Sequence, residues 1–481
     1  MRVSQHYELD HSQPSLDFVD GYVVNDVQVF LDPSAIQLLR SQWADECREL
    51  LATFFSSVLE ALSNNDRERV RALMSRLGEP NETHLGFSSG RSRGRGLGKT
   101  SGQFVADALS RSRAARTGLL SQLEDTILLV PGIGHDIVSD IATNVLRGPL
   151  IAYTQAQAAY HEIPLLQVAS GPVWNPARSE WETGFTHLPA PNGRKLLLVP
   201  KSLVRIKLDF SKDEYYGDYL IPILQEQEIH TPGGSLVQML KKGPRVTKKS
   251  IKEKYGTDKD SIAELTAMHR EALDGYRRQK RDATSPPLDH GVIAAVTHSG
   301  PVDFAALLDA VISIPSGSAN ATSYHRAIEA LLTALFYPAL SDPDVESGLH
   351  DGRKRVDIRY TNVAQRGFFD WLRRHRVPCA HVYVECKNYS SDAANPELDQ
   401  LAGRFSPPRG TVGILASRSF RDKELFIQRC RDTALDGRGY CIPLDDDDLR
   451  ALVAERQHGE EANRAQMIEF GLLKAIYDRL V

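Results

Sequence analysis

Apolar residues in the C-terminal third of the chain recur alternately at helical spacing and at strand spacing. Residues 321–340 place Ile328, Leu331, Leu332 and Leu335 on one helical stripe. The stretches "KRVDIRYTN" (354–362), "HVYVECKNY" (381–389), "TVGILAS" (411–417) and "GYCIPLDD" (439–446) have the apolar pattern of strands. Helical patterns lie between them, so the order predicts an α/β fold, a mixed sheet flanked by helices on both faces.

The pattern before residue 280 is different. Residues 15–31 predict a β-hairpin or three short strands, and residues 34–62 carry apolar residues at helical spacing. Residues 195–206 predict a strand that a proline interrupts. We expect a larger, mostly helical α+β module over 1–280, with a recognition, regulatory or assembly role. Pro, Gly and Ser then mark a connector over 281–322, ahead of the C-terminal domain, 323–481.

Composition narrows the class of protein. A chain of 481 residues exceeds one compact core, which predicts two or three domains. Five cysteines without a CxxC pair favour a reducing compartment, and neither an apolar leader nor a membrane span is visible. We therefore expect a cytoplasmic protein that does not enter the membrane. The net charge of -4 means that any surface for nucleic acid must be a local patch.

Two local segments are candidates for such a patch. In the first, the basic tract, the candidate DNA-backbone contacts are Lys241, Lys242, Arg245, Lys248, Lys249 and Lys252. A solvated helix face is the alternative interpretation of these residues. The second is the Arg/Gly loop at 86–103, which contains "GRGLGKTS". It is not a phosphate-binding P-loop, because Arg93 stands where that motif needs glycine and no apolar strand precedes it.

Charged side chains at the ends of two predicted strands carry the candidate chemistry. Asp357 lies on the strand before Glu385, and Lys387 follows Glu385 by two residues, so it points to the same face. Two carboxylates from adjacent strands make an oxygen site for Mg²⁺, and a nearby ammonium can stabilise developing negative charge. Phosphodiester hydrolysis needs these parts. The alternative is an ion pair on a solvated strand edge.

On these residues the chain resembles the PD-(D/E)XK nuclease superfamily, which has the restriction-endonuclease-like fold, and its Mrr-like members. The resemblance covers roughly residues 320 to 450 and rests on Asp357 in "RKRVDIRY" and on Glu385 with Lys387 in "VYVECKNY". Glu329 stands where many members have a further metal-linked glutamate, and Gln400 where Mrr-like members often have glutamine. The usual proline before the aspartate is replaced by valine.

The resemblance implies a role for each residue. Asp357, Glu385 and Glu329 would hold Mg²⁺ or Mn²⁺, Lys387 would position the water, and Gln400 would support them. A helix-surface position is the alternative for Glu329 and for Gln400. Arg404, one turn after Gln400, is a candidate phosphate contact or a surface arginine.

The expected function is therefore metal-dependent endonucleolytic cleavage of DNA, with double-stranded DNA favoured. By analogy of architecture, we expect a prokaryotic restriction or anti-phage defence effector, which forms a homo-oligomer and has a partner protein in its defence system. Two alternatives stay open: an RNA nuclease acting on tRNA, and a catalytically silent DNA-binding module with a nuclease-like fold.

Overall fold

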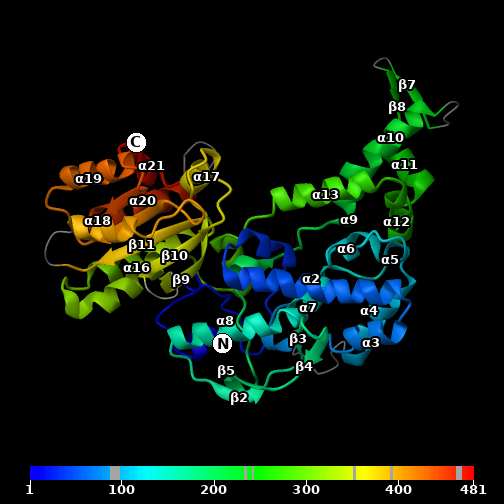
Figure 1. Cartoon of the computed structure of the whole chain (residues 1–481), viewed down its shortest axis with the longest axis horizontal. Helices are drawn as coiled ribbons and strands as arrows, with labels where there is room; N and C mark the ends of the chain where they lie inside the picture. Colours follow the sequence, from blue (N-terminus) through cyan, green and yellow to red (C-terminus); the bar gives the residue numbers. More distant parts are fainter. Residues whose placement is uncertain (87–97, 232–235, 241–242, 350–353, 390–393, 462–468) are drawn as a thin grey trace.

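The computed structural model describes residues 1–86, 98–231, 236–240, 243–349, 354–389, 394–461 and 469–481. A body built around a β-sheet, yellow to red in Figure 1, lies beside a larger helical region coloured blue to green. Each has its own main apolar core. The predicted mixed α/β fold class is confirmed.

The sheet of the C-terminal body has five strands in the order β13-β12-β11-β10-β9. Antiparallel pairing joins β9 to β10 and β10 to β11, whereas β11, β12 and β13 run parallel. The strands are β9 (Leu340–Leu349), β10 (Lys354–Asn362), β11 (His381–Lys387), β12 (Val412–Ser417) and β13 (Tyr440–Leu444). Both β11 and β12 are buried almost throughout, because helices cover the parallel half of the sheet on both faces.

The helices of this body follow the predicted alternation with the strands. They are α14 (His290–Thr297), α15 (Phe304–Ile312), α16 (Ala321–Phe336), α17 (Gly367–Arg374), α18 (Asn395–Ala402), α19 (Lys423–Leu435), α20 (Asp446–Glu461) and α21 (Gly471–Asp478). The predicted stripe of α16 is buried in the C-terminal core. Helices α16 and α18 lie on opposite faces, since adjacent residues of β11 contact them: Cys386 lies close to His325 of α16, and Glu385 bonds to Gln400 of α18.

The N-terminal region consists mainly of helices. They are α1 (Val3–His6), α2 (Gln42–Ser63), α3 (Arg67–Met74), α4 (Gly98–Arg111), α5 (Arg113–Arg116), α6 (Asp125–Leu129), α7 (His135–Val145), α8 (Arg147–Tyr160), α9 (Lys212–Tyr215), α10 (Ile221–His230), α11 (Lys248–Tyr255), α12 (Lys259–Met268) and α13 (Arg270–Asp282). Helix α2 begins after Ser41, whose hydroxyl accepts a hydrogen bond from the Ala44 N–H at 3.3 Å.

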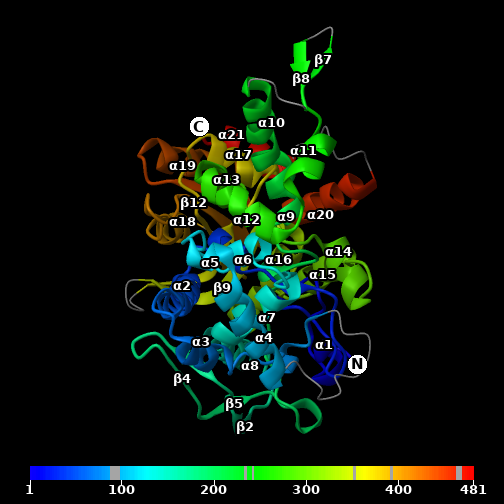
Figure 2. The same ribbon diagram turned by 90° about the vertical axis from the view of Figure 1, so that its right-hand side faces the viewer.

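Its strands are short and pair in twos. They are β1 (Phe30–Leu31) with β6 (Val204–Arg205), β2 (Leu166–Ala169) with β5 (Phe185–Leu188), β3 (Val173–Asn175) with β4 (Glu180–Glu182), and β7 (Gln238–Leu240) with β8 (Gly243–Arg245). Figures 1 and 2 show β7 and β8 at a projecting tip of the molecule, away from the five-stranded sheet.

Two predictions for the N-terminal region are wrong. Residues 15–31 form neither a hairpin nor three strands. They contain strand β1 at Phe30–Leu31 and isolated bridges in which Phe18 pairs with Pro200 and Val27 with Leu85, so the hydrogen-bond partners of this backbone come from distant segments. The stretch 195–206 is a strand only at Val204–Arg205. In both places long-range contacts replace the local pairing that the sequence pattern predicts.

The segment predicted as a connector contains two helices, α14 and α15. Phe304 and Val311 of α15 are buried in the C-terminal core. The end of α14 is held by the N-terminal region, where Tyr22 Oη donates to the Thr297 carbonyl at 3.0 Å and Arg2 Nη1 to the His298 carbonyl at 3.1 Å. Packing of the C-terminal body thus starts before residue 323.

Candidate active site

The antiparallel pairing of β10 and β11 brings Asp357 and Glu385 together. Ile358 lies opposite Val384, so Asp357 and Glu385 occupy the next pair toward the end of the ladder. The Asp357 carboxylate accepts a hydrogen bond from the backbone N–H of Cys386 at 2.7 Å, which ties it to β11. Its side chain is 22% exposed, so solvent reaches this end of the two strands.

Glu385, Lys387 and Gln400 form one hydrogen-bonded group on the face that α18 covers. Lys387 Nζ lies 2.8 Å from Glu385 Oε1 and 3.3 Å from Gln400 Oε1. The Gln400 amide donates its Nε2–H to the same Glu385 oxygen. The structure therefore brings together three of the residues that the sequence singled out, and their side chains fix one another.

One oxygen of Glu385 lacks a hydrogen-bond partner within the described part of the chain. The residue is 1% exposed, and Oε2 accepts no hydrogen bond from any part of the chain that the structure describes. An unsatisfied buried carboxylate oxygen costs free energy. This oxygen could accept a cation, which would recover that cost.

Burial and neighbouring charges shift the pKa values of Glu385 and Lys387. Burial raises the pKa of Glu385, the Asp357 carboxylate raises it further, and Lys387 opposes both. Burial would lower the pKa of Lys387, but its hydrogen bond and charge interaction with Glu385 raise it overall. The lysine therefore keeps its ammonium form beside two carboxyl groups, and the excess of acidic groups favours a further cation.

A residue that the sequence analysis did not single out also contacts this group. His325 of α16 places Nε2 at 3.5 Å from Asp357 Oδ2 and 3.1 Å from the Cys386 carbonyl. Cys386 is buried, and its sulfur lies within 4.8 Å of the nearest ligand atoms of His325 and Asp357. The sequence signal available was the placement of His325 one helical turn before Glu329.

Glu329 lies in a different environment. Its Oε2 accepts a hydrogen bond from the Tyr160 hydroxyl of α8 at 3.0 Å, and its Oε1 one from Thr333 at 3.3 Å. Burial raises its pKa to about 7; Asp17 adds to the shift, and the two hydrogen bonds and Lys201 oppose it. Because both oxygens are engaged by hydroxyl groups at the junction with the N-terminal region, the structure does not bring Glu329 into the Asp357 and Glu385 group.

Arg404 follows α18 and is half-buried. Its charge lowers the pKa of Glu385, which places the guanidinium within electrostatic reach of the site. Its Nε is buried and has no hydrogen-bond partner among the described residues. Whether Arg404 contacts a phosphate stays a prediction.

The basic tract is remote from this group. Lys241 and Lys242 lie outside the described residues. Arg245 of β8 and Lys249 and Lys252 of α11 are exposed, whereas Lys248 bonds to the Gly217 carbonyl at 2.8 Å and to Asp218 at 3.1 Å. In Figures 1 and 2, β8 lies at the projecting tip of the N-terminal region, and α11 lies between this tip and the rest of the region. Residues 91, 93 and 95 of the Arg/Gly loop also lie outside the described residues.

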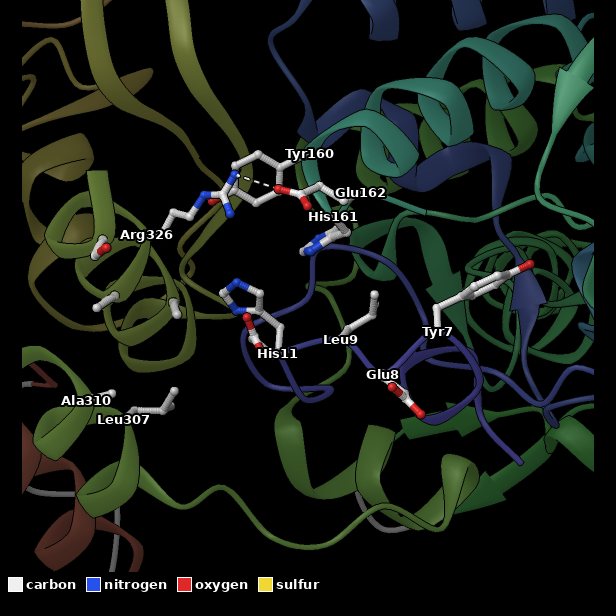
Figure 3. A pocket seen from close by; sticks show the side chains of 14 residues that line it. Tyr7, Glu8, Leu9, His11, Tyr160, His161, Glu162, Leu307, Ala310 and Arg326 are labelled. Atoms are coloured by element: carbon white, nitrogen blue, oxygen red, sulfur yellow. Dashed lines mark ion pairs between the residues drawn. The ribbon is translucent and has the colours of Figure 1, made fainter. Parts of the chain in front are cut away.

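A cavity of about 630 Å³ separates the N-terminal segment at Tyr7 and His11 from α15 and α16. Figure 3 shows His11 and His161 next to each other, with ring centroids 5.2 Å apart, and Arg326 on the α16 side. Burial lowers the pKa of His11, and lowers that of His161 to about 4. Its described lining contains neither Asp357 nor Glu385, so we do not assign the phosphodiester chemistry to this cavity.

Comparison with known proteins covers only the N-terminal region. A family model described as a domain of unknown function (DUF8370) matches residues 8–211. No curated protein and no solved structure matches the chain. The match ends well before β9, so the candidate active site lies outside the part that it covers. Within the described ranges, no helix has both the length and the apolar character needed to cross a bilayer.

Proposed function

We propose that the C-terminal body is a Mg²⁺- or Mn²⁺-dependent endonuclease that hydrolyses phosphodiester bonds in DNA. One observation carries the proposal: two carboxylates and one ammonium lie within electrostatic range of one another where β10 and β11 adjoin. They belong to Asp357, Glu385 and Lys387, in the strand positions where the resemblance to PD-(D/E)XK nucleases requires them.

The donor set fits a hard divalent cation. Both proposed ligand groups are carboxylates, which Mg²⁺ and Mn²⁺ prefer, and Oε2 of Glu385 is buried without a partner among the described residues. Asp357 is partly exposed, so the same cation could also contact water and a substrate. Such an ion would polarise a phosphoryl oxygen and lower the pKa of a bound water.

The remaining side chains hold this arrangement in place. Lys387 presents a positive charge beside the carboxylates, where negative charge develops during attack on phosphorus. Gln400 has both a donor and an acceptor, so it can bond to Glu385 and Lys387 together and fix both side chains. Arg404 adds a charge that could contact a neighbouring phosphate.

The biological setting is part of the proposal and rests on analogy of architecture. We propose a cytoplasmic restriction or anti-phage defence effector that cuts double-stranded DNA as a homo-oligomer, with a partner protein in its defence system. Five free, buried cysteines support a reducing compartment. The N-terminal region would serve recognition, regulation or assembly.

Incubation of the full chain with supercoiled plasmid, single-stranded DNA and total RNA, each with Mg²⁺ or with EDTA, tests the activity. We expect Mg²⁺-dependent nicking of plasmid that Glu385→Gln abolishes. Asp399→Asn is the matched control, because Asp399 is a carboxylate next to Gln400 that pairs instead with Arg438 at 2.7 Å. Cleavage of RNA alone would move the assignment to an RNA nuclease. DNA binding without any cleavage would favour the silent DNA-binding module.

A further inference from the structure

The face of β11 opposite Glu385 carries a second set of metal-ligating atoms. They are Nε2 of His325, a carboxylate oxygen of Asp357 and Sγ of Cys386, all within 4.8 Å of one another. A metal on Nε2 would replace the 3.1 Å hydrogen bond from this nitrogen to the Cys386 carbonyl and leave the ring proton on Nδ1. His325 comes from α16, Asp357 from β10 and Cys386 from β11, so three separate elements converge on one point. Nitrogen, oxygen and sulfur donors in one cluster differ from the all-carboxylate set proposed for Mg²⁺.

The spacing suits a small tetrahedral ion. Two ligand atoms that each lie about 2.1 Å from a tetrahedral Zn²⁺ are about 3.4 Å apart. His325 Nε2 and Asp357 Oδ2 are 3.5 Å apart. The sulfur of Cys386, which lies within 4.8 Å of the other two ligand atoms, would move toward them to complete a three-ligand set, and a water would occupy the fourth position.

Solvent reaches the cluster, and its donor atoms favour Zn²⁺ over Mg²⁺. The side chains of His325 and Asp357 are 34% and 22% exposed. Thiolate and imidazole ligands favour Zn²⁺ over Mg²⁺, because they are softer donors than carboxylate or water. Cys386 is buried, and burial raises the pKa of its thiol, so a metal bound there must displace the thiol proton.

We propose that His325, Asp357 and Cys386 form a binding site for Zn²⁺ or a similar soft divalent cation. This site shares Asp357 with the proposed Mg²⁺ set, but the rest of its ligands lie on the other face of the sheet. A cation held there would draw the Asp357 carboxylate toward His325 and neutralise part of its charge. Zn²⁺ would thereby inhibit the Mg²⁺-dependent cleavage, a regulatory role that rests on the proposed nuclease function.

Cobalt titration of the EDTA-treated full chain tests the metal site without any need for activity. Co²⁺ bound by a thiolate gives a sulfur-to-cobalt charge-transfer absorption in the near ultraviolet. We expect this band to saturate at one equivalent, to vanish when Zn²⁺ is added, and to be lost in Cys386→Ser. His325→Gln should weaken Co²⁺ binding at least about tenfold. Cys379→Ser is the matched control, since Cys379 is another buried free cysteine of the same body.

Absence of the band in the folded wild-type chain, or its persistence in Cys386→Ser, would overturn the site.

Inhibition is measured separately, as the Zn²⁺ concentration that halves each variant's own Mg²⁺-dependent rate. We expect this concentration to rise at least about tenfold in His325→Gln and in Cys386→Ser but not in Cys379→Ser. An unchanged value in both variants would overturn the regulatory role. If the wild type cleaves no DNA, the nuclease proposal and the inhibitory role fail. The cobalt charge-transfer band then still tests whether the metal site exists.

Discussion

Lys387 Nζ lies 2.8 Å from Oε1 of Glu385, two residues earlier on the same strand, and both side chains are largely buried. A buried charge that loses its partner is costly, so neither residue can be removed without consequences for folding. Effects on activity and on stability must therefore be measured separately at this site.

We expect Lys387→Met to lower the free energy of unfolding by about 3 kcal/mol at neutral pH, because Glu385 would remain buried without its cation. The double variant Glu385→Gln/Lys387→Met should recover much of the loss, since no charge stays unpaired. Urea unfolding of the two single variants and the double variant gives the coupling between the side chains. Additive losses would contradict a coupled pair.

Asp357→Asn should reduce Mg²⁺-dependent plasmid cleavage by at least about 100-fold, or ~2.7 kcal/mol in activation free energy, because it removes a proposed metal ligand. Its carbonyl oxygen can still accept the Cys386 N–H, so the free energy of unfolding should change by less than about 1 kcal/mol. Initial rates and urea midpoints on the same preparation check both statements. Wild-type cleavage by this variant would remove Asp357 from the site.

Glu329→Gln should change the dependence of stability on pH. The folded chain holds the proton of Glu329 up to about pH 7, whereas the unfolded chain releases it near 4.5. Stability from this group is therefore complete below pH 4.5 and falls as pH rises to 7, by on the order of 3 kcal/mol. The side chain faces Tyr160 and Thr333, with Asp17 and Lys201 in electrostatic range.

Glutamine at 329 carries no proton to lose, so the wild type should lose stability between pH 5 and pH 8 relative to the variant. Urea midpoints at several pH values measure this difference. A parallel course of the two curves would show that Glu329 titrates normally. If Glu329 is not a metal ligand, the Mg²⁺ concentration that gives half-maximal cleavage should be the same in both proteins.

Neutralising Lys248, Lys249 and Lys252 to glutamine should weaken DNA binding and leave cleavage at saturating DNA near the wild-type rate. Each lost phosphate contact lowers the slope of log affinity against log salt by about one unit. Lys248 pairs with Asp218 at 3.1 Å and Lys249 with Glu253 at 3.8 Å, so we expect Lys248, which has the shorter ion pair, to contribute least. An unchanged salt slope would identify the tract as a solvated face.

A C-terminal fragment that starts at residue 300 should be more stable than one that starts at 323. The shorter fragment lacks α15, whose Phe304 and Val311 are buried against the C-terminal core. Loss of these two side chains should cost at least about 3 kcal/mol. Thermal unfolding of the two purified fragments compares them, and equal midpoints would place the boundary back near residue 323.

The sequence predicted the C-terminal body well because its signals are local. Val356, Ile358 and Tyr360 alternate strictly, and β10 occupies the predicted residues 354–362. Lys387 and Gln400 were singled out separately, and the structure joins them through Glu385. Strand β9 was not predicted because Asp342 and Pro343 interrupt its apolar pattern. Its strand propensity is weak, and pairing with β10 overrides it.

What the sequence could not supply were contacts between distant segments. Glu329 sits on the flank of an apolar helical stripe, and only the fold shows that it faces Tyr160, 169 residues away. His325 carried no motif of its own, and its proximity to Asp357 and Cys386 depends on how α16 packs against the sheet. The hairpin predicted over 15–31 failed for the same reason, since its backbone pairs with residues near 85 and 200.

The hydrogen bond between Tyr160 and Glu329 has a consequence for how this chain can be recombined with others. A C-terminal body transplanted onto an unrelated N-terminal region would bring a buried carboxyl group without the hydroxyl that satisfies it. Chimeras should therefore be more stable when α8 is transferred together with α16, or when Glu329 is replaced at the same time. We expect α8 and α16 to be inherited together, even where the sequence of the projecting tip of the N-terminal region is replaced.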